Sequence, residues 1–146
     1  ICVAHPMILR PRRSCAGARE AWDRGATELC LQGGIHPDYT GETYLLLCRE
    51  LKHAVPDIHI HAFSPLEVFQ GAATLGVTVR DLLSALKQTG LGSLPGTAAE
   101  ILDDTVRSEI CPDKVTAAQW VDIVGAAHDL GIPTTATIML RPCRAA

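Results

Sequence analysis

The chain has 146 residues, which is enough for one domain with a hydrophobic core but fewer than the about 250 of a complete α/β barrel. Its 13 basic and 16 acidic residues give a formal net charge of −3, which excludes the basic footprint of a nucleic-acid-binding protein. No run of about 18 apolar residues occurs, so we expect no membrane-spanning segment.

The first well-patterned segment is a short helix over 18–24, which Gly25 closes as a C-cap. The apolar run at 28–32 predicts a strand that breaks at Gly33 and Gly34, where the lack of Cβ atoms lets the backbone approach a ligand closely. Because ligands of parallel α/β proteins lie at the carboxyl ends of strands, this stretch is a candidate ligand site. An ordinary glycine turn is the alternative.

Helices and strands then alternate along the chain. Thr40 is a suitable N-cap for a helix that runs to about His53, and the alternation over 58–63 predicts a strand. Capping boxes predict the starts of further helices: Ser64 with Glu67, Thr78 with Asp81, and Thr116 with Gln119. Thr97 and Glu100 predict one more helical turn, followed by a helical piece to Ile110. Short strands are predicted at 91–94 and 134–139.

This order of elements predicts an α/β fold in which parallel strands are joined by right-handed crossovers. It contains about four β/α units, which fits either an incomplete (β/α) barrel or a small open sheet. We favour the incomplete barrel because the predicted strands end in small or polar residues that suit a ligand site: Gly33-Gly34, Ser64 and Pro95-Gly96.

His59 and His61 lie on one face of a predicted strand, so both rings could reach one metal ion, as in metal-dependent barrel hydrolases. Such a site needs further ligands, and of the other histidines in the patterned region His53 and His128 fall on helices while His36 does not. The alternative is that the pair lines a polar pocket.

Other polar residues have two interpretations each. Glu100 follows a strand end, where its carboxylate could bind ligand hydroxyls or an ammonium group, or complement a helix dipole. Arg107 and Lys114 are candidate anion contacts or solvated side chains. The sequence has no Ser-His-Asp order, Walker loop or dinucleotide fingerprint.

Three stretches together resemble one family: ELCLQGGIHPDYTG, IHIHAFSPLEV and GLGSLPGTAAEILDDTVRSEICPDK. They are similar to the C-terminal, tyrosine-using module of the FO synthases, the radical S-adenosylmethionine (SAM) enzymes of deazaflavin coenzyme biosynthesis. PTTATIM is similar to the next barrel strand, so the resemblance spans about residues 18 to 139. Radical SAM enzymes of the futalosine menaquinone pathway share QGG-like and PG-AE-like elements and are the nearest alternative.

The resemblance implies a partial radical SAM barrel that holds SAM and a 4Fe-4S cluster at the carboxyl ends of its strands. In that family a radical from SAM abstracts hydrogen from tyrosine, and a hydroxybenzyl group passes to 5-amino-6-(D-ribitylamino)uracil. By position, the implied SAM-binding residues are Gln32, Gly33, Gly34 and Glu100. The residues implied to face the substrates are His36, His59 and His61.

The family holds its cluster with a CxxxCxxC loop upstream of the helix that contains Glu20, Ala21 and Trp22. This chain has no such triplet, and its six cysteines are widely spaced: Cys2, Cys15, Cys30, Cys48, Cys111 and Cys143. We therefore expect no cluster and no metal ligands here, which would make the chain as written a folded but inactive fragment. The spacing also favours free thiols in the cytoplasm.

The two ends differ from the middle in composition. Segments 1–17 and 140–146 are rich in arginine, proline, cysteine and alanine, whereas 18–139 carries the barrel pattern. Our hypothesis is that both ends are non-native translation, as from a frameshift or a misplaced exon boundary. A barrel of this length would leave its edge strands unpaired, so we expect association through those edges.

Overall fold

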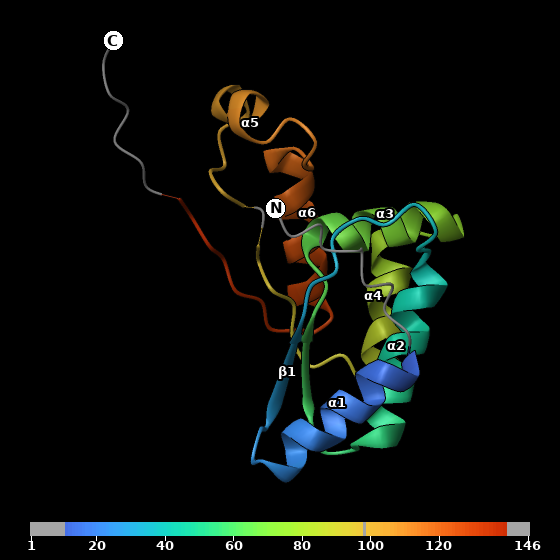
Figure 1. Ribbon diagram of the computed structural model, residues 1–146. Helices are drawn as coiled ribbons and strands as arrows, with labels where there is room; N and C mark the ends of the chain where they lie inside the picture. Colours follow the sequence, from blue (N-terminus) through green and yellow to red (C-terminus); the bar gives the residue numbers. More distant parts are fainter. Residues whose placement is uncertain (1–10, 98, 140–146) are drawn as a thin grey trace.

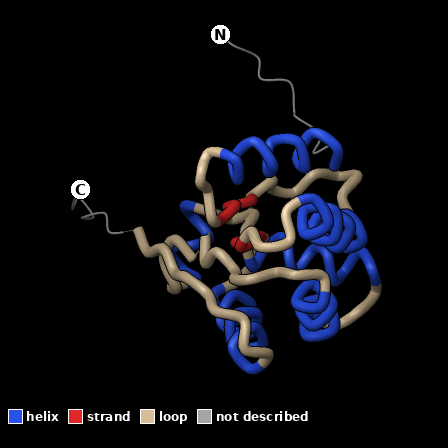
Figure 2. Tube along the Cα trace, turned by 90° about the horizontal axis from the view of Figure 1, so that it is seen from below, coloured by secondary structure: helices blue, strands red, loops and turns tan. Residues whose placement is uncertain are grey.

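The computed structural model of the protein describes residues 11–97 and 99–139. The elements, in chain order, are α1 (Pro11–Asp23), β1 (Glu28–Leu31), α2 (Gly41–Ala54), β2 (His59–Ala62), α3 (Pro65–Leu75), α4 (Val79–Gln88), α5 (Asp104–Ile110) and α6 (Ala117–Asp129). The strands lie near the middle with helices on several sides of them (Figures 1 and 2). Within these residues, no helix has the length and apolar character needed to cross a bilayer.

The sheet is parallel, as predicted. β1 pairs with β2 in a register that sets Glu28 beside His59 and Cys30 beside His61. Isolated parallel bridges extend it in chain order, because His61 pairs with Ser93 and Leu94 pairs with Thr134. The α/β class is therefore confirmed.

The prediction of regular strands at 91–94 and 134–139 is wrong, because only single bridges form there. Gly92, Pro95 and Gly96 interrupt the first segment, and proline has no N–H to donate to a ladder. Hydrogen bonds still join the two segments, because Leu94 N–H donates to the Pro133 carbonyl over 2.9 Å.

The hydrophobic core lies between β2 and the helices α2, α3, α4 and α6. Burial alternates along β2, where Ile60 and Ala62 are fully buried and His59 and His61 are only half-buried. Helices therefore cover the face of Ile60, and the two histidines lie on the opposite face of the sheet. The largest fully buried apolar side chains include Leu51, Ile58, Ile60, Leu82, Leu83, Leu86, Leu94 and Ile132.

Helix α1 begins earlier than the sequence predicts. It starts at Pro11 rather than Ala18, and proline suits the first turn of a helix because its missing N–H has no intrahelical partner there. Cys15 and Ala18 on this helix pack against the core. Residues 1–10 and 140–146, with Cys2 and Cys143, lie outside the described residues, so the hypothesis about the ends remains a prediction.

The local helix signals are largely confirmed. The capping boxes at Ser64, Thr78 and Thr116 form, and Thr40 is the N-cap of α2. The helical turn predicted from Thr97 and Glu100 is wrong. Asp103 caps α5 instead, accepting a hydrogen bond from Val106 N–H over 3.1 Å, and Glu100 has a left-handed backbone with φ of 50° that a right-handed helix excludes.

A buried thiol on α2 gives a pH-dependent prediction. Cys48 is 0% exposed, and burial raises the pKa of its thiol from the ordinary 9.0 to about 12, against smaller opposing effects from Thr89 and Lys52. The unfolded chain would lose this proton near pH 9, so we expect the free energy of unfolding to fall as the pH rises from about 9 to about 12. At about pH 8, alkylation followed by mass spectrometry should modify the exposed Cys30 and spare Cys48.

The same alkylation in denaturant serves as the control, because both thiols are then accessible. Equal rates for Cys30 and Cys48 in the native protein would contradict this packing.

Candidate functional site

The loop after β1 lies at the carboxyl edge of the sheet, where the sequence predicts the ligand site. Gly33 N–H donates a hydrogen bond of 2.9 Å to Oε1 of Glu67 on α3. Gly34 has a left-handed backbone with φ of 66°, which favours glycine, and no atom lies within 4 Å of the place where its Cβ would stand. The loop is thus held from the α3 side and open at Gly34.

Glu67 is the residue that fixes this edge. Its side chain is only 1% exposed, and its Oε2 accepts hydrogen bonds from Ser64 N–H over 2.7 Å and from the Ser64 hydroxyl over 2.8 Å. One carboxylate therefore joins the loop after β1 to the first turn of α3. Phe63, between β2 and α3, has a φ of 66°, and such strain in a non-glycine residue is most often found at functional sites.

His59 and His61 meet at one serine hydroxyl. His59 Nε2 lies 2.8 Å from Ser93 Oγ, and His61 Nδ1 lies 2.6 Å from the same oxygen. Gly92 makes room for this arrangement, because a Cβ there would stand 2.4 Å from His59 Cε1. Sequence reasoning missed Ser93, whose only local signal is a small polar residue in a short predicted strand.

The histidine pair is not part of a metal site in the part of the chain that the structure describes. No group of three His, Cys, Asp or Glu side chains that could hold a metal ion occurs among residues 11–97 and 99–139. Both rings bond to Ser93 instead, which does not favour the metal-dependent hydrolase.

His36 contacts other residues than His59 and His61 do. Its Nδ1 accepts a hydrogen bond of 3.2 Å from Asp38 N–H, and its ring centroid is 4.7 Å from that of Tyr39. The ring contacts continue from Tyr39 to Tyr44 and from Tyr44 to Phe63. A series of aromatic contacts therefore joins His36 to Phe63, the residue with a left-handed backbone after β2.

Glu100 lies in a segment held by Arg107. Glu100 pairs with Ile138 through a parallel bridge, and its left-handed backbone is flanked by the carbonyls of Ala99 and Ile101. The Arg107 guanidinium donates to both carbonyls, over 3.0 Å to Ile101, and also to the carbonyl of Val115. Arg107 is 3% exposed, so the prediction of a solvated side chain is wrong, whereas the alternative of an anion contact stays a prediction.

Loss of the hydrogen bonds from Arg107 to these carbonyls should destabilise the protein. We expect Arg107→Met to lower the free energy of unfolding by about 3 kcal/mol, because three buried carbonyls lose their charged donor. Denaturant titration measures the change. Arg80→Met is the matched control, since Arg80 forms an exposed ion pair with Asp129 whose loss should cost less than about 1 kcal/mol. Equal losses of the free energy of unfolding in Arg107→Met and Arg80→Met would contradict this role of Arg107.

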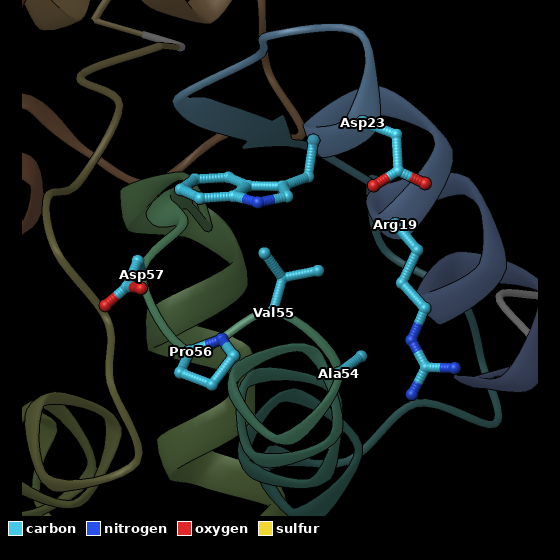
Figure 3. A pocket seen from close by; sticks show the side chains of 7 residues that line it. Arg19, Asp23, Ala54, Val55, Pro56 and Asp57 are labelled. Carbon is cyan, nitrogen blue, oxygen red and sulfur yellow. The ribbon is translucent and has the colours of Figure 1, made fainter.

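A cavity of about 290 Å³ lies at the opposite end of the strands. It is lined by α1 and by the link between α2 and β2: Arg19, Trp22, Asp23, Ala54, Val55, Pro56 and Asp57. In Figure 3, Arg19 and Asp23 come from α1, and Val55 and Pro56 from the link. Because Asp57 precedes β2 whereas Gly33 follows β1, this cavity is not at the predicted ligand edge.

Comparison with known proteins gives relatives of high identity. No protein-family model matches the chain. The chain is 52% identical over 122 residues to a 5-amino-6-(D-ribitylamino)uracil–L-tyrosine 4-hydroxyphenyl transferase of Methanothermobacter thermautotrophicus, which covers 84% of the chain and 33% of the relative. The transferase of the same name from Methanopyrus kandleri is 53% identical, with the same coverage.

An FO synthase of Streptomyces coelicolor is 50% identical over 84% of the chain and 14% of the relative. The chain thus spans about a third of the length of the transferases and a smaller share of the FO synthase. The resemblance predicted from the three sequence stretches is confirmed, because most of this chain corresponds to a segment of the FO synthases and the 4-hydroxyphenyl transferases.

Proposed function

We propose that the chain is a segment of a radical SAM transferase of deazaflavin biosynthesis, which joins a group from L-tyrosine to 5-amino-6-(D-ribitylamino)uracil. The observation that carries this proposal is the identity of about half over 84% of the chain to proteins of that name. The same relatives favour it over the futalosine-pathway enzymes. The partners are then small cytoplasmic metabolites rather than nucleic acid or membrane.

For the fold, we propose an incomplete (β/α) barrel over residues 18–139. Its support is the order of the parallel pairings, which run from β1 to β2, then to Ser93 and Leu94, and then to Thr134. Neighbouring strands follow chain order in a barrel of this type. The face with His59 and His61 would be the barrel interior. Among the described strands β1 pairs only with β2, so its other edge is available for association.

SAM would lie against Gln32, Gly33 and Gly34. The residues present fit this role, because Glu67 holds the loop while the open, left-handed Gly34 lets the backbone approach a ligand. Glu100 is the fourth proposed contact, and its strained backbone supports a functional role. SAM supplies the radical in this family, and the residues of this chain bind and orient the reactants.

The described residues fit a 4Fe-4S cluster less well than they fit SAM. Of the described thiols, Cys48 is buried in the core and Cys30 is exposed on β1. Residues 11–97 and 99–139 also contain no three-ligand group. The described cysteines therefore do not fit a cluster site.

The substrates would lie on the side of the sheet that carries His59 and His61, with His36 at its edge. Both strand histidines are half-buried and can exchange protons with a bound molecule. Tyrosine and the aminouracil both carry groups that gain or lose protons during a transfer, which is the chemistry imidazoles supply.

A hybrid enzyme tests the proposal. Residues of this chain replace the matching segment of the Methanothermobacter transferase, and product from tyrosine and 5-amino-6-(D-ribitylamino)uracil is measured with SAM under reducing conditions. We expect product from the hybrid. Gly34→Ala should lower its rate by about tenfold because an alanine strains the left-handed turn.

Gly125→Ala is the matched control, since Gly125 on α6 also has open space around its Cβ position but no left-handed backbone. A folded hybrid that makes no product would contradict the proposed function. Equal rates for the two alanine variants would contradict the role of the Gly34 turn.

A further inference from the structure

We propose that His59, Ser93 and His61 form a proton relay across the polar face of the sheet. The relay carries a proton along β2, between His59 and a position two residues nearer the carboxyl edge. Its use by the proposed transferase rests on the proposed function, but the relay itself does not depend on which reaction it serves.

The geometry of the three side chains carries this inference. The Ser93 hydroxyl lies within hydrogen-bond distance of both imidazoles, at 2.8 Å from His59 Nε2 and 2.6 Å from His61 Nδ1. A serine hydroxyl has one proton to donate and lone pairs to accept with. With both rings neutral, it therefore donates to one imidazole and accepts from the other.

This arrangement permits a balanced proton transfer. When His59 holds the additional proton, its Nε2–H donates to Ser93 Oγ, and the Ser93 O–H donates to His61 Nδ1. The N–H bond at His59 and the O–H bond of Ser93 then break while a new O–H bond and an N–H bond at His61 form. One proton has moved from His59 to His61, Ser93 is unchanged, and no electron is transferred.

The surroundings open the relay to solvent at His59. Glu28 Oε2 lies 3.8 Å from His59 Nε2, and these two side chains are roughly half exposed, so protons can enter from water there. Ser93 is 9% exposed, which protects the bridging hydroxyl from competing water. Gly92 fixes the His59 ring, because a Cβ at this position would occupy the place of the ring.

The titratable side chains that lie beside His59 and His61 in the sheet belong to β1. On β1, the titratable side chains in register with the histidines are Glu28 and Cys30. On the far side, segment 134–139 carries no titratable side chain. The coupling between the two imidazoles thus runs through Ser93, with Glu28 and Cys30 as the neighbours to account for.

The test measures the ring nitrogen resonances of His59 and His61 in the full 146-residue chain by nuclear magnetic resonance. In the unchanged protein, we expect hydrogen-bonded resonances at His59 Nε2 and His61 Nδ1, because one hydroxyl bonds to both atoms. In Ser93→Ala, both resonances should move to the positions of imidazoles without that hydrogen bond. Ser108→Ala is the matched control, since the Ser108 hydroxyl donates to the backbone carbonyl of Thr105 within α5.

A second variant keeps the test decisive if Ser93→Ala disturbs the fold. His59→Asn leaves Ser93 in place and should change the His61 Nδ1 resonance, because the hydroxyl then has His61 as its remaining ring partner. Resonances of imidazoles without this hydrogen bond in the unchanged protein, or resonances that Ser93→Ala leaves as they were, would overturn the relay. Neither result depends on transferase activity, so failure of the relay and failure of the proposed function are distinguishable.

Discussion

Gly96→Ala is expected to lower the free energy of unfolding by about 3 kcal/mol or more, the largest loss among the substitutions considered. A Cβ at Gly96 would stand 1.5 Å from the Thr135 carbonyl oxygen and 2.4 Å from its carbon, and both belong to backbone that cannot rotate away. Gly96 also donates to the Thr135 hydroxyl and accepts from Thr137 N–H. The substitution would therefore separate 94–96 from 134–137.

Denaturant titration of Gly96→Ala beside Gly125→Ala measures this effect. Gly125 lies within α6 with no atom near its Cβ position, so alanine there should leave stability unchanged or raise it by up to about 1 kcal/mol. A Gly96→Ala protein as stable as the control would show that the two segments do not pair as described.

Glu67→Ala is also expected to lower the free energy of unfolding by about 3 kcal/mol. The substitution removes a carboxylate that is 1% exposed and accepts from Gly33 N–H, Ser64 N–H and the Ser64 hydroxyl, so three charge-assisted hydrogen bonds are lost. The loop after β1 would also lose its link to α3, so the SAM binding that we propose for this loop should weaken together with stability.

Glu42→Ala is the control for charge, since Glu42 is an exposed carboxylate in the first turn of α2. Its loss should change stability by no more than about 0.5 kcal/mol. Glu67→Gln should recover part of the stability, because its amide oxygen can still accept from one side. If alanine at position 67 costs no more than alanine at position 42, the carboxylate does not hold the loop.

The elements that the sequence predicts well are those fixed by neighbouring residues. The capping boxes at Ser64, Thr78 and Thr116 join residues three apart, so their patterns determine the helix starts directly. The pairing of 91–94 and 134–139 depends on residues distant in the chain. Alternating or β-branched residues there indicated strands, but glycine and proline limit the ladder to single bridges.

The same distinction between local patterns and contacts distant in the chain applies to the candidate site. The position of Gly33 and Gly34 at a strand end followed from the order of strand and turn, whereas the bond from Gly33 to Glu67 joins residues 34 apart in the chain. Ser93 was missed, and the carbonyl contacts of Arg107 were not predicted, for the same reason, because these roles come from tertiary contacts with His59, His61 and the Ala99 carbonyl. Local patterns give such residues no distinguishing signal.

Titration of the 146-residue chain with SAM, followed by the backbone amide resonances, tests the proposed SAM site most directly. We expect saturable shifts at Gly33, Gly34 and Glu100, and weaker ones in Gly34→Ala. Shifts confined to the α1 cavity at Arg19 and Trp22, or no saturable shift anywhere in the chain, would contradict a SAM site at the carboxyl edge of β1.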